Sequence, residues 1–328
     1  MVSAVLTASL WAALLLAPVP SAASAAVAGT WRAEWPDTDF TKRTIDLSEI
    51  RSGGPPKDGI PSIDDPRFVP VAEATDLTLT EPVIALSLGG DARAYPLRIL
   101  TWHEIVNDTV GGVPVAVTYC PLCNAAIAFE RQVDGRVLDF GTTGKLRHSD
   151  LVMYDRQTES WWQQYTGIAI VGELAGLALK MLPVRIEAFE RFRRQHPDGR
   201  VLVPNNPSLR PYGANPYVGY DRSRVPFLYD GSFPEGIAPM AYVVAVGNEA
   251  WSLDLLRQKG RIEAGDLELS WEPGQNSALD AQFISQGRDI GNVTVRRRGA
   301  DGSDAVPHHV TFAFVFHAFQ PHGRLHTE

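Results

Sequence analysis

The 328-residue sequence predicts a β-rich α+β fold made of two related sheet-and-helix halves. Short apolar segments alternate with polar residues and are separated by turns rich in Gly, Pro and Asp, which is typical of strands. Two pairs of segments far apart in the chain also share a pattern. Hydrophobic residues make up 45% of the chain and charged residues 21%, so an ordinary globular core is expected. The formal net charge of −8 argues against nucleic acid as a partner, and no other partner is indicated.

Residues 1–26 are predicted to be a signal peptide. An apolar run over residues 5–19 is followed by the small residues Ser24, Ala25 and Ala26, which suit a signal peptidase. No Lys or Arg precedes the run, and a membrane anchor is the alternative. The run is shorter than the roughly 20 residues that a membrane span needs. We therefore expect cleavage, no transmembrane span in the mature chain, and a periplasmic or secreted location.

The remaining chain divides into three parts. Residues 27–80 are rich in Pro, Gly and Asp and read as an irregular lead-in draped outside the fold. The first repeat, 81–205, contains "EPVIALSLGGDARAYPLRIL", and the shorter second repeat, 206–328, contains the similar "MAYVVAVGNEAWSLDLL".

The repeat rests on two alignments. Leu97 aligns with Leu253, and Pro197 of "FERFRRQHPDGRVL" aligns with Pro321 of "FVFHAFQPHGRLH". Residues 140–167 have no evident counterpart in the second repeat. The stretch of the second repeat that corresponds to the cysteine stretch contains no thiol. Duplication is the favoured explanation and chance similarity is the alternative. If duplication holds, the first copy carries the chemistry.

The only two cysteines, Cys120 and Cys123, lie in "VTYCPLCNAAIAFER". Alternation before and after the pair predicts a strand on each side, with the cysteines at a hairpin tip. In thioredoxin-like proteins the dithiol instead sits at a helix N-terminus, where the helix dipole lowers a thiol pKa. One pair does not form a disulfide framework. A Cys-x-x-Cys turn between two strands favours a metal-binding knuckle, a tight turn that offers two sulfur atoms to one metal ion.

A knuckle supplies only two ligands, so further ligands must come from His, Asp or Glu. A helix is expected to begin after Pro96, with His103 on an inward stripe, packed against the cysteine strand. His103 is the favoured third ligand, and Glu104 and His148 are more distant candidates. The alternative is a core-facing His103 with satisfied hydrogen bonds. Sulfur ligands favour copper or zinc.

The segment "FGTTGKLRHSDLVMYDRQTESWWQQYTG" is dense in polar and aromatic groups. Its "GTTGK" is too short for a phosphate loop, and Leu146 replaces the Ser or Thr that would bind magnesium, so no nucleotide is expected. The alternative to a pocket is a hairpin turn shaped by Asp155 and Thr158. The candidate pocket residues are Lys145, Asp150, Tyr154, Asp155, Ser160, Trp162, Gln163 and Gln164.

Together "HEIVND", "TYCPLC", the 140–167 segment and "HPDGRVL" resemble the domain of unknown function 3179 family of secreted bacterial and archaeal proteins. The resemblance is strong over residues 80–205 and looser elsewhere. It implies a fold and an extracytoplasmic location, not an activity. Two residues depart from the pattern: His148 stands where a smaller polar residue such as Asn is usual, and Asn124 stands where Gly is common. Asn tolerates the left-handed backbone that such a turn needs.

Three functions follow from these observations. The first is binding of a soft metal ion by Cys120, Cys123 and His103, with an open coordination position. The second is thiol–disulfide redox chemistry by the same cysteine pair. The third is a ligand-binding module that uses Trp161 or Trp162 as a platform. The sequence assigns no catalytic residue and no reaction.

Overall fold

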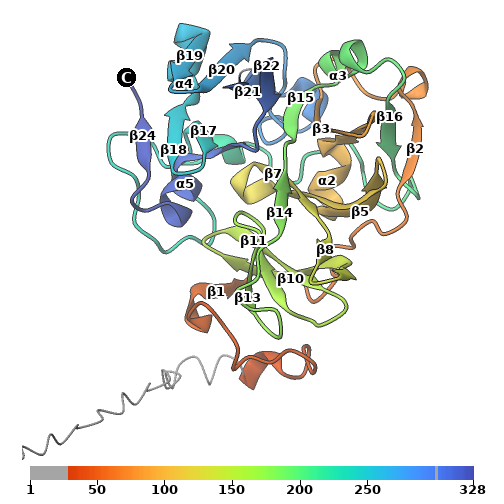
Figure 1. The fold of residues 1–328 in the computed structure, drawn as a ribbon, viewed down its shortest axis with the longest axis vertical. Coiled ribbons are helices and arrows are strands. Elements are labelled where there is room, and N and C mark those ends of the chain that lie inside the picture. The colour runs from red at the N-terminus through yellow and green to blue at the C-terminus, as the bar shows by residue number, and fades with distance from the viewer. Residues whose placement is uncertain (1–28, 300–301) are drawn as a thin grey trace, which may run out of the picture.

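The computed structural model describes residues 29–299 and 302–328, so the predicted signal peptide lies outside the described residues. Several small sheets are arranged in a ring, as Figure 1 shows. Strands hold 41% of the residues and helices 15%, which confirms the β-rich class. Across the described ranges, no helix combines the length and apolar character that a membrane crossing requires.

One sheet of the first half begins with a hairpin whose turn uses Gly89 and Gly90. Both glycines have positive φ (55° and 84°), which suits a tight two-residue turn. The last strand of the half, β16, runs parallel to β4. In spatial order the sheet is β15 (Arg185–Ala188), β3 (Pro82–Leu88), β4 (Asp91–Pro96), β16 (Arg200–Val203) and β2 (Arg67–Pro70), with helices α2 (Leu97–His103) and α3 (Phe189–Gln195) following β4 and β15.

A sheet of the second half has the same order and connections, without a counterpart of β2. It consists of β23 (His309–Phe312), β17 (Tyr242–Val246), β18 (Glu249–Ser252) and β24 (Arg324–His326), with α4 (Leu253–Lys259) and α5 (Ala313–Phe319) following β18 and β23. Leu97 and Leu253 each begin a helix, and Pro197 and Pro321 each lie two residues past one. The aligned segments thus occupy matching places, while descent from a duplication stays a prediction.

Each half also has a small antiparallel sheet, whose strands lie in the chain between α2 and β15 in the first half and between α4 and β23 in the second half. In the first half it is β14 (Lys180–Leu182), β7 (Ala125–Glu130), β6 (Val113–Cys120) and β5 (Ile105–Val110). In the second half it is β19 (Arg261–Ala264), β20 (Leu267–Glu272), β21 (Asn292–Gly299) and β22 (Gly302–Ala305). A two-stranded ribbon, β8 (Gln132–Val133) with β9 (Arg136–Val137), follows β7.

The segment without a counterpart, residues 140–167, supplies the three middle strands of a further sheet, whose edge strands come from the lead-in and from the residues that directly follow the segment. This sheet is β1 (Ile50–Ser52), β10 (Phe140–Arg147), β11 (Asp150–Asp155), β12 (Trp161–Gln163) and β13 (Ile168–Val171). Trp35 and Phe40 from the lead-in pack edge-on against Trp161 and are buried. The lead-in therefore does more than drape the surface, because large aromatic side chains gain most when they are removed from water.

Five short 3₁₀ turns complete the described elements: η1 (Leu47–Glu49), η2 (Val71–Glu73), η3 (Pro121–Cys123), η4 (Tyr220–Arg222) and η5 (Ile284–Gln286).

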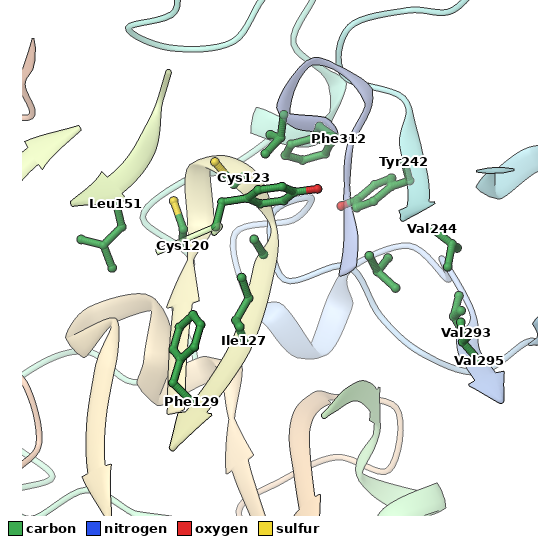
Figure 2. Packing of buried hydrophobic residues seen from close by; sticks show 14 of the residues in the cluster. Cys120, Cys123, Ile127, Phe129, Leu151, Tyr242, Val244, Val293, Val295 and Phe312 are labelled. Carbon is green, nitrogen blue, oxygen red and sulfur yellow. The ribbon is translucent and has the colours of Figure 1, made fainter. Parts of the chain in front are cut away.

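The largest hydrophobic core is shared by both halves. Ile127 and Phe129 of β7 belong to the same cluster as Val244, Val293 and Phe312 of the second half. Figure 2 shows Cys120 and Cys123 within this cluster, at the bend between two strands. The cysteine pair therefore lies where the two halves meet.

Candidate functional site

The cysteines occupy the tip of the β6–β7 hairpin, as the alternation predicted. Cys120 ends β6 opposite Ala125 of β7, and η3 forms the turn between them. Asn124 closes the turn with left-handed backbone (φ 49°), the conformation that Asn tolerates. Directly after Cys120 the chain forms a single 3₁₀ turn and then enters β7, so the first thiol does not lie at the N-terminus of an α-helix whose dipole would stabilise a thiolate.

Partners from both halves hold the turn. The Tyr119 hydroxyl donates to Asn124 Oδ1 (3.1 Å), and Asn124 Nδ2 donates to the Val310 carbonyl (2.9 Å). The Thr311 hydroxyl donates to the Cys123 carbonyl (2.7 Å). Strand β23 of the second half therefore fixes the backbone that carries the thiols.

Both thiols are enclosed. Cys120 is 2% exposed and Cys123 is 0% exposed. Burial raises the pKa of Cys120 above its ordinary value and raises that of Cys123 further. Cys120 Sγ lies 3.8 Å from the Ser149 carbonyl oxygen, to which it donates. Both groups are therefore protonated thiols at neutral pH.

Asp150 brings a carboxylate to the two thiols. It begins β11 directly after a tight turn in which His148 and Ser149 have positive φ (53° and 69°). Asp150 Oδ2 accepts hydrogen bonds from Gln163 Nε2 (2.6 Å) and the Tyr165 backbone N–H (2.9 Å). Asp150 Oδ1 is buried with no hydrogen-bond partner in the described part of the chain.

Cys120, Cys123 and Asp150 form a compact group. One ligand atom from each residue lies within 4.8 Å of the other two, and all three side chains are buried. In a tetrahedral zinc site, sulfur ligands at about 2.3 Å from the ion lie about 3.8 Å apart. The three ligand atoms would therefore need to move only slightly closer together to hold an ion.

The electrostatics of the group are set by burial and by a second carboxyl. Burial raises the pKa of Asp150 to about 6, so it is mostly ionised at neutral pH. Burial, with a smaller contribution from the Asp150 charge, raises the pKa of Glu104 to about 8. A buried Asp150 carboxylate, with no ion pair to any residue that the structure describes, therefore lies beside two neutral thiols.

His103 does not join this group, which corrects the predicted third ligand. It ends helix α2 and is buried, as expected from its inward stripe. However, Nδ1 lies 2.7 Å from the Pro61 carbonyl oxygen and Nε2 lies 2.7 Å from the Tyr212 hydroxyl. The ring also stacks on Tyr212. His103 is thus the core-facing histidine with satisfied hydrogen bonds that was the alternative.

The two more distant ligand candidates also lie outside the three-residue group. His148, in the β10–β11 turn, has its Nε2 3.5 Å from a Glu49 carboxylate oxygen and its ring against Phe319. Glu104 is buried and lines a neighbouring cavity with Lys145. Its position makes it a neighbour of the group, not a member.

The pocket candidates separate into two sets. Asp155 accepts from the Thr158 backbone N–H (2.7 Å), the Thr158 hydroxyl and Trp162 Nε1 (2.9 Å), and the Thr158 hydroxyl bonds that of Ser160. These four residues shape a turn, which was the alternative interpretation. The Tyr154 hydroxyl donates to Asp58 of the lead-in (2.5 Å) and not to a residue of the cysteine hairpin.

The other set surrounds the thiols or the cavity. Gln163 holds Asp150, and Gln164 Nε2 donates to Thr118 (2.8 Å) and to the Ala125 carbonyl beside the hairpin tip. Lys145 Nζ pairs with Glu34 (3.0 Å) and lines the cavity. Asp150 itself was predicted as a pocket residue and not as a ligand, because the sequence does not show that its strand reaches the hairpin.

Comparisons with known proteins give a family and no relative of known activity. No curated protein gave a significant match to the chain. No solved structure gave one either. The family match extends over residues 57–323 and includes the hairpin, Asp150 and both halves of the ring. The chain therefore belongs to the family described as protein of unknown function, DUF3179.

Proposed function

We propose that this protein binds a soft metal ion, zinc or copper, at Cys120, Cys123 and Asp150, and that it works outside the cytoplasm. The observation that carries the metal site is the Asp150 carboxylate: one of its oxygens lies within 4.8 Å of both sulfur atoms, and Oδ1 is buried without a hydrogen-bond partner among the described residues. Buried polar atoms are nearly always paired, and the two weak S–H donors are the nearest partners of this carboxylate. A metal ion would replace both thiol protons and serve as a stronger partner for all three groups. The location rests on the N-terminal sequence.

The donor set narrows the choice of metal. Thiolates suit both copper(I) and zinc, while a carboxylate oxygen suits zinc better than copper(I). Gln163 and the Tyr165 N–H would orient the ligating carboxylate through its other oxygen. Three protein ligands leave one tetrahedral position for water or a small ligand.

The thiol–disulfide function has less support. Exchange requires a thiolate that a partner can reach, whereas both thiols are almost fully buried and burial raises the pKa of each. The hairpin also lacks the α-helix N-terminus that would lower a thiol pKa. These features favour metal binding over thiol–disulfide exchange.

Metal analysis of protein purified without an affinity tag or chelator tests the proposal. We expect one equivalent of metal in the wild type, and a loss of most of it in Cys120→Ser and in Asp150→Asn. Asp134→Asn is the matched control, because Asp134 is an exposed turn residue with positive φ (49°), which Asn accepts. It should retain the wild-type metal content.

Two results would contradict the metal site. One is metal that persists in both Cys120→Ser and Asp150→Asn. The other is wild-type protein that takes up no zinc or copper when reduced and metal-free, but forms a reversible disulfide, which would support the redox function instead.

Metal affinity is expected to depend steeply on pH. Burial raises the pKa of both thiols, so each must lose a proton to bind metal, whereas Asp150, with a pKa of about 6, is already mostly ionised above pH 7. Release of two protons makes the apparent association constant rise about 100-fold per pH unit near pH 7 to 8. Competition with a chromophoric chelator measures this slope. A rise of only tenfold per unit would show that one thiol, not two, is deprotonated on binding.

We also propose that the two halves descend from a duplication and that only the first half keeps the site. The shared sheet order and the paired positions of Leu97 and Leu253 support this. The second half has no cysteine and no counterpart of residues 140–167, the segment that supplies Asp150. A superposition in which the matching strands and helices failed to overlay in chain order would contradict the duplication.

A further inference from the structure

A cavity of about 650 Å³ adjoins the cysteine hairpin. Leu122, between the two cysteines, and Leu151, next to Asp150, form part of its wall. The segment 216–227 of the second half forms the opposite wall. Neither thiol lines the cavity, so it is a space beside the proposed metal site.

Glu104 is the one acidic side chain among the residues that line the cavity. It caps helix α2, has an unusual positive φ (59°) and is 8% exposed. Its carboxyl group forms no hydrogen bond or ion pair with any residue that the structure describes. Lys145, the only basic lining residue, is already paired: its Nζ lies 3.0 Å from Glu34 Oε2 and 3.3 Å from the Thr143 carbonyl. The cavity therefore holds one acidic group, Glu104, that has no basic partner among the described residues.

The rest of the wall is aromatic and aliphatic. Tyr217, Tyr220 and Phe227 come from the 216–227 segment. Phe227 is 52% exposed and Val218 is 57% exposed, so both present apolar surface. Aromatic faces attract cations as well as apolar groups. Burial, with a smaller contribution from the Glu104 charge, raises the pKa of Tyr217, so the phenol lies near the carboxyl.

We propose that this cavity binds a small organic cation, an ammonium group on an aromatic or branched apolar body. The ammonium would pair with the Glu104 carboxylate, and the body would lie against Tyr217, Tyr220 and Leu122. The proposal is independent of the metal site, because the cavity walls and the unpaired carboxyl are formed without a metal.

Charge excludes the other classes of ligand. An anion would face repulsion from the ionised Asp150, whose charge contributes to the raised pKa of Glu104. A neutral ligand would leave the buried carboxyl unpaired, at a cost comparable to a lost hydrogen bond. Burial raises the pKa of Glu104 to about 8, and a bound cation would return it to the ionised form at neutral pH.

Titration calorimetry with three ligands of one shape tests the charge requirement on the unaltered protein. The probes are tryptamine, which carries the ammonium, 3-ethylindole, which lacks it, and indole-3-propionate, which is an anion. We expect tryptamine to bind about tenfold or more tighter than 3-ethylindole, because a hydrogen bond to a charged group contributes roughly 1.5–3 kcal/mol. Indole-3-propionate should bind weakest.

Glu104→Gln tests the residue. This substitution should reduce tryptamine affinity about tenfold or more and leave 3-ethylindole binding unchanged. Glu235→Gln, at an exposed position, is the matched control and should behave as the wild type. If tryptamine and 3-ethylindole bind the wild type equally, or if Glu104→Gln binds tryptamine normally, the proposal is overturned.

The metal content of the same preparations keeps the two proposals apart. Protein that prefers tryptamine but takes up no metal would overturn the metal site alone. Protein that holds one equivalent of metal but shows no preference among the indoles would overturn the cation cavity alone.

Discussion

Zinc at about 1,000 times its dissociation constant is expected to raise the free energy of unfolding of the wild-type protein by about 4 kcal/mol. The reason is that the site exists only when the β6–β7 hairpin and the start of β11 are docked, so zinc binds the folded chain and not the unfolded one. For a chain of this size, the midpoint of thermal unfolding should rise by roughly 8 °C. Differential scanning calorimetry of chelator-treated and zinc-loaded protein measures the shift.

Cys120→Ser provides the comparison for this shift. Without one sulfur ligand, the variant should show almost no change in unfolding midpoint on addition of zinc, although its metal-free stability stays close to that of the wild type. An equal zinc-induced shift in the two proteins would mean that zinc binds elsewhere. A fall in the wild-type midpoint would mean that zinc prefers the unfolded chain.

Glu104→Gln is expected to stabilise the metal-free protein by about 5 kcal/mol at pH 9 and by almost nothing at pH 4. An unfolded Glu ionises near pH 4.5, whereas burial raises the folded-state pKa of Glu104 to about 8. A carboxyl whose folded pKa is raised costs stability progressively as pH rises from 4.5 to 8, and the cost is constant above that range. Gln cannot ionise and escapes this cost, which amounts to about 1.4 kcal/mol per pKa unit.

Urea unfolding of the two proteins across this pH range gives the difference directly. Asp150→Asn offers a second comparison, since part of the Glu104 shift comes from the Asp150 charge. In that background the gain from Glu104→Gln should be smaller. A gain that is the same at pH 4 and pH 9 would show that the effect comes from packing and not from ionisation.

The parts of the fold that depend on local pattern could be predicted from the sequence. Alternation around Cys120 and Cys123 gave the two strands and placed the thiols at their turn. Pro96 marked the start of helix α2, since its fixed φ suits a helix N-terminus. The alignment of Leu97 with Leu253 anticipated two hairpins with helices in matching places. Each of these features involves residues that are close together in the chain.

The composition of the site depends on contacts between distant segments, and here the sequence favoured His103 where the structure brings Asp150 to the two cysteines. Periodicity showed that His103 points inward but not what it meets there, and its partners, Pro61 and Tyr212, lie 42 and 109 residues away. Asp150 was recognised as polar and noteworthy, yet its approach to the thiols depends on how one sheet packs on another. Alternation of apolar and polar residues with a period of two shows which face of a strand is buried. It does not show which other sheet packs against that face.

The lead-in illustrates the same limit. Its Pro, Gly and Asp content correctly indicated little regular structure, since residues 29–80 contain only short strands and turns. Composition did not show that Trp35 and Phe40 would find Trp161, more than a hundred residues later. A few large side chains can anchor an irregular segment as firmly as a ladder of backbone hydrogen bonds.

The bonds from Asn124 to Val310 and from Thr311 to Cys123 make the thiol-bearing loop depend on a strand almost two hundred residues downstream. A product truncated near residue 205 would keep every proposed metal ligand and still lose the clamp that positions two of them. The second half therefore helps to position the thiols although it contributes no ligand to the proposed site.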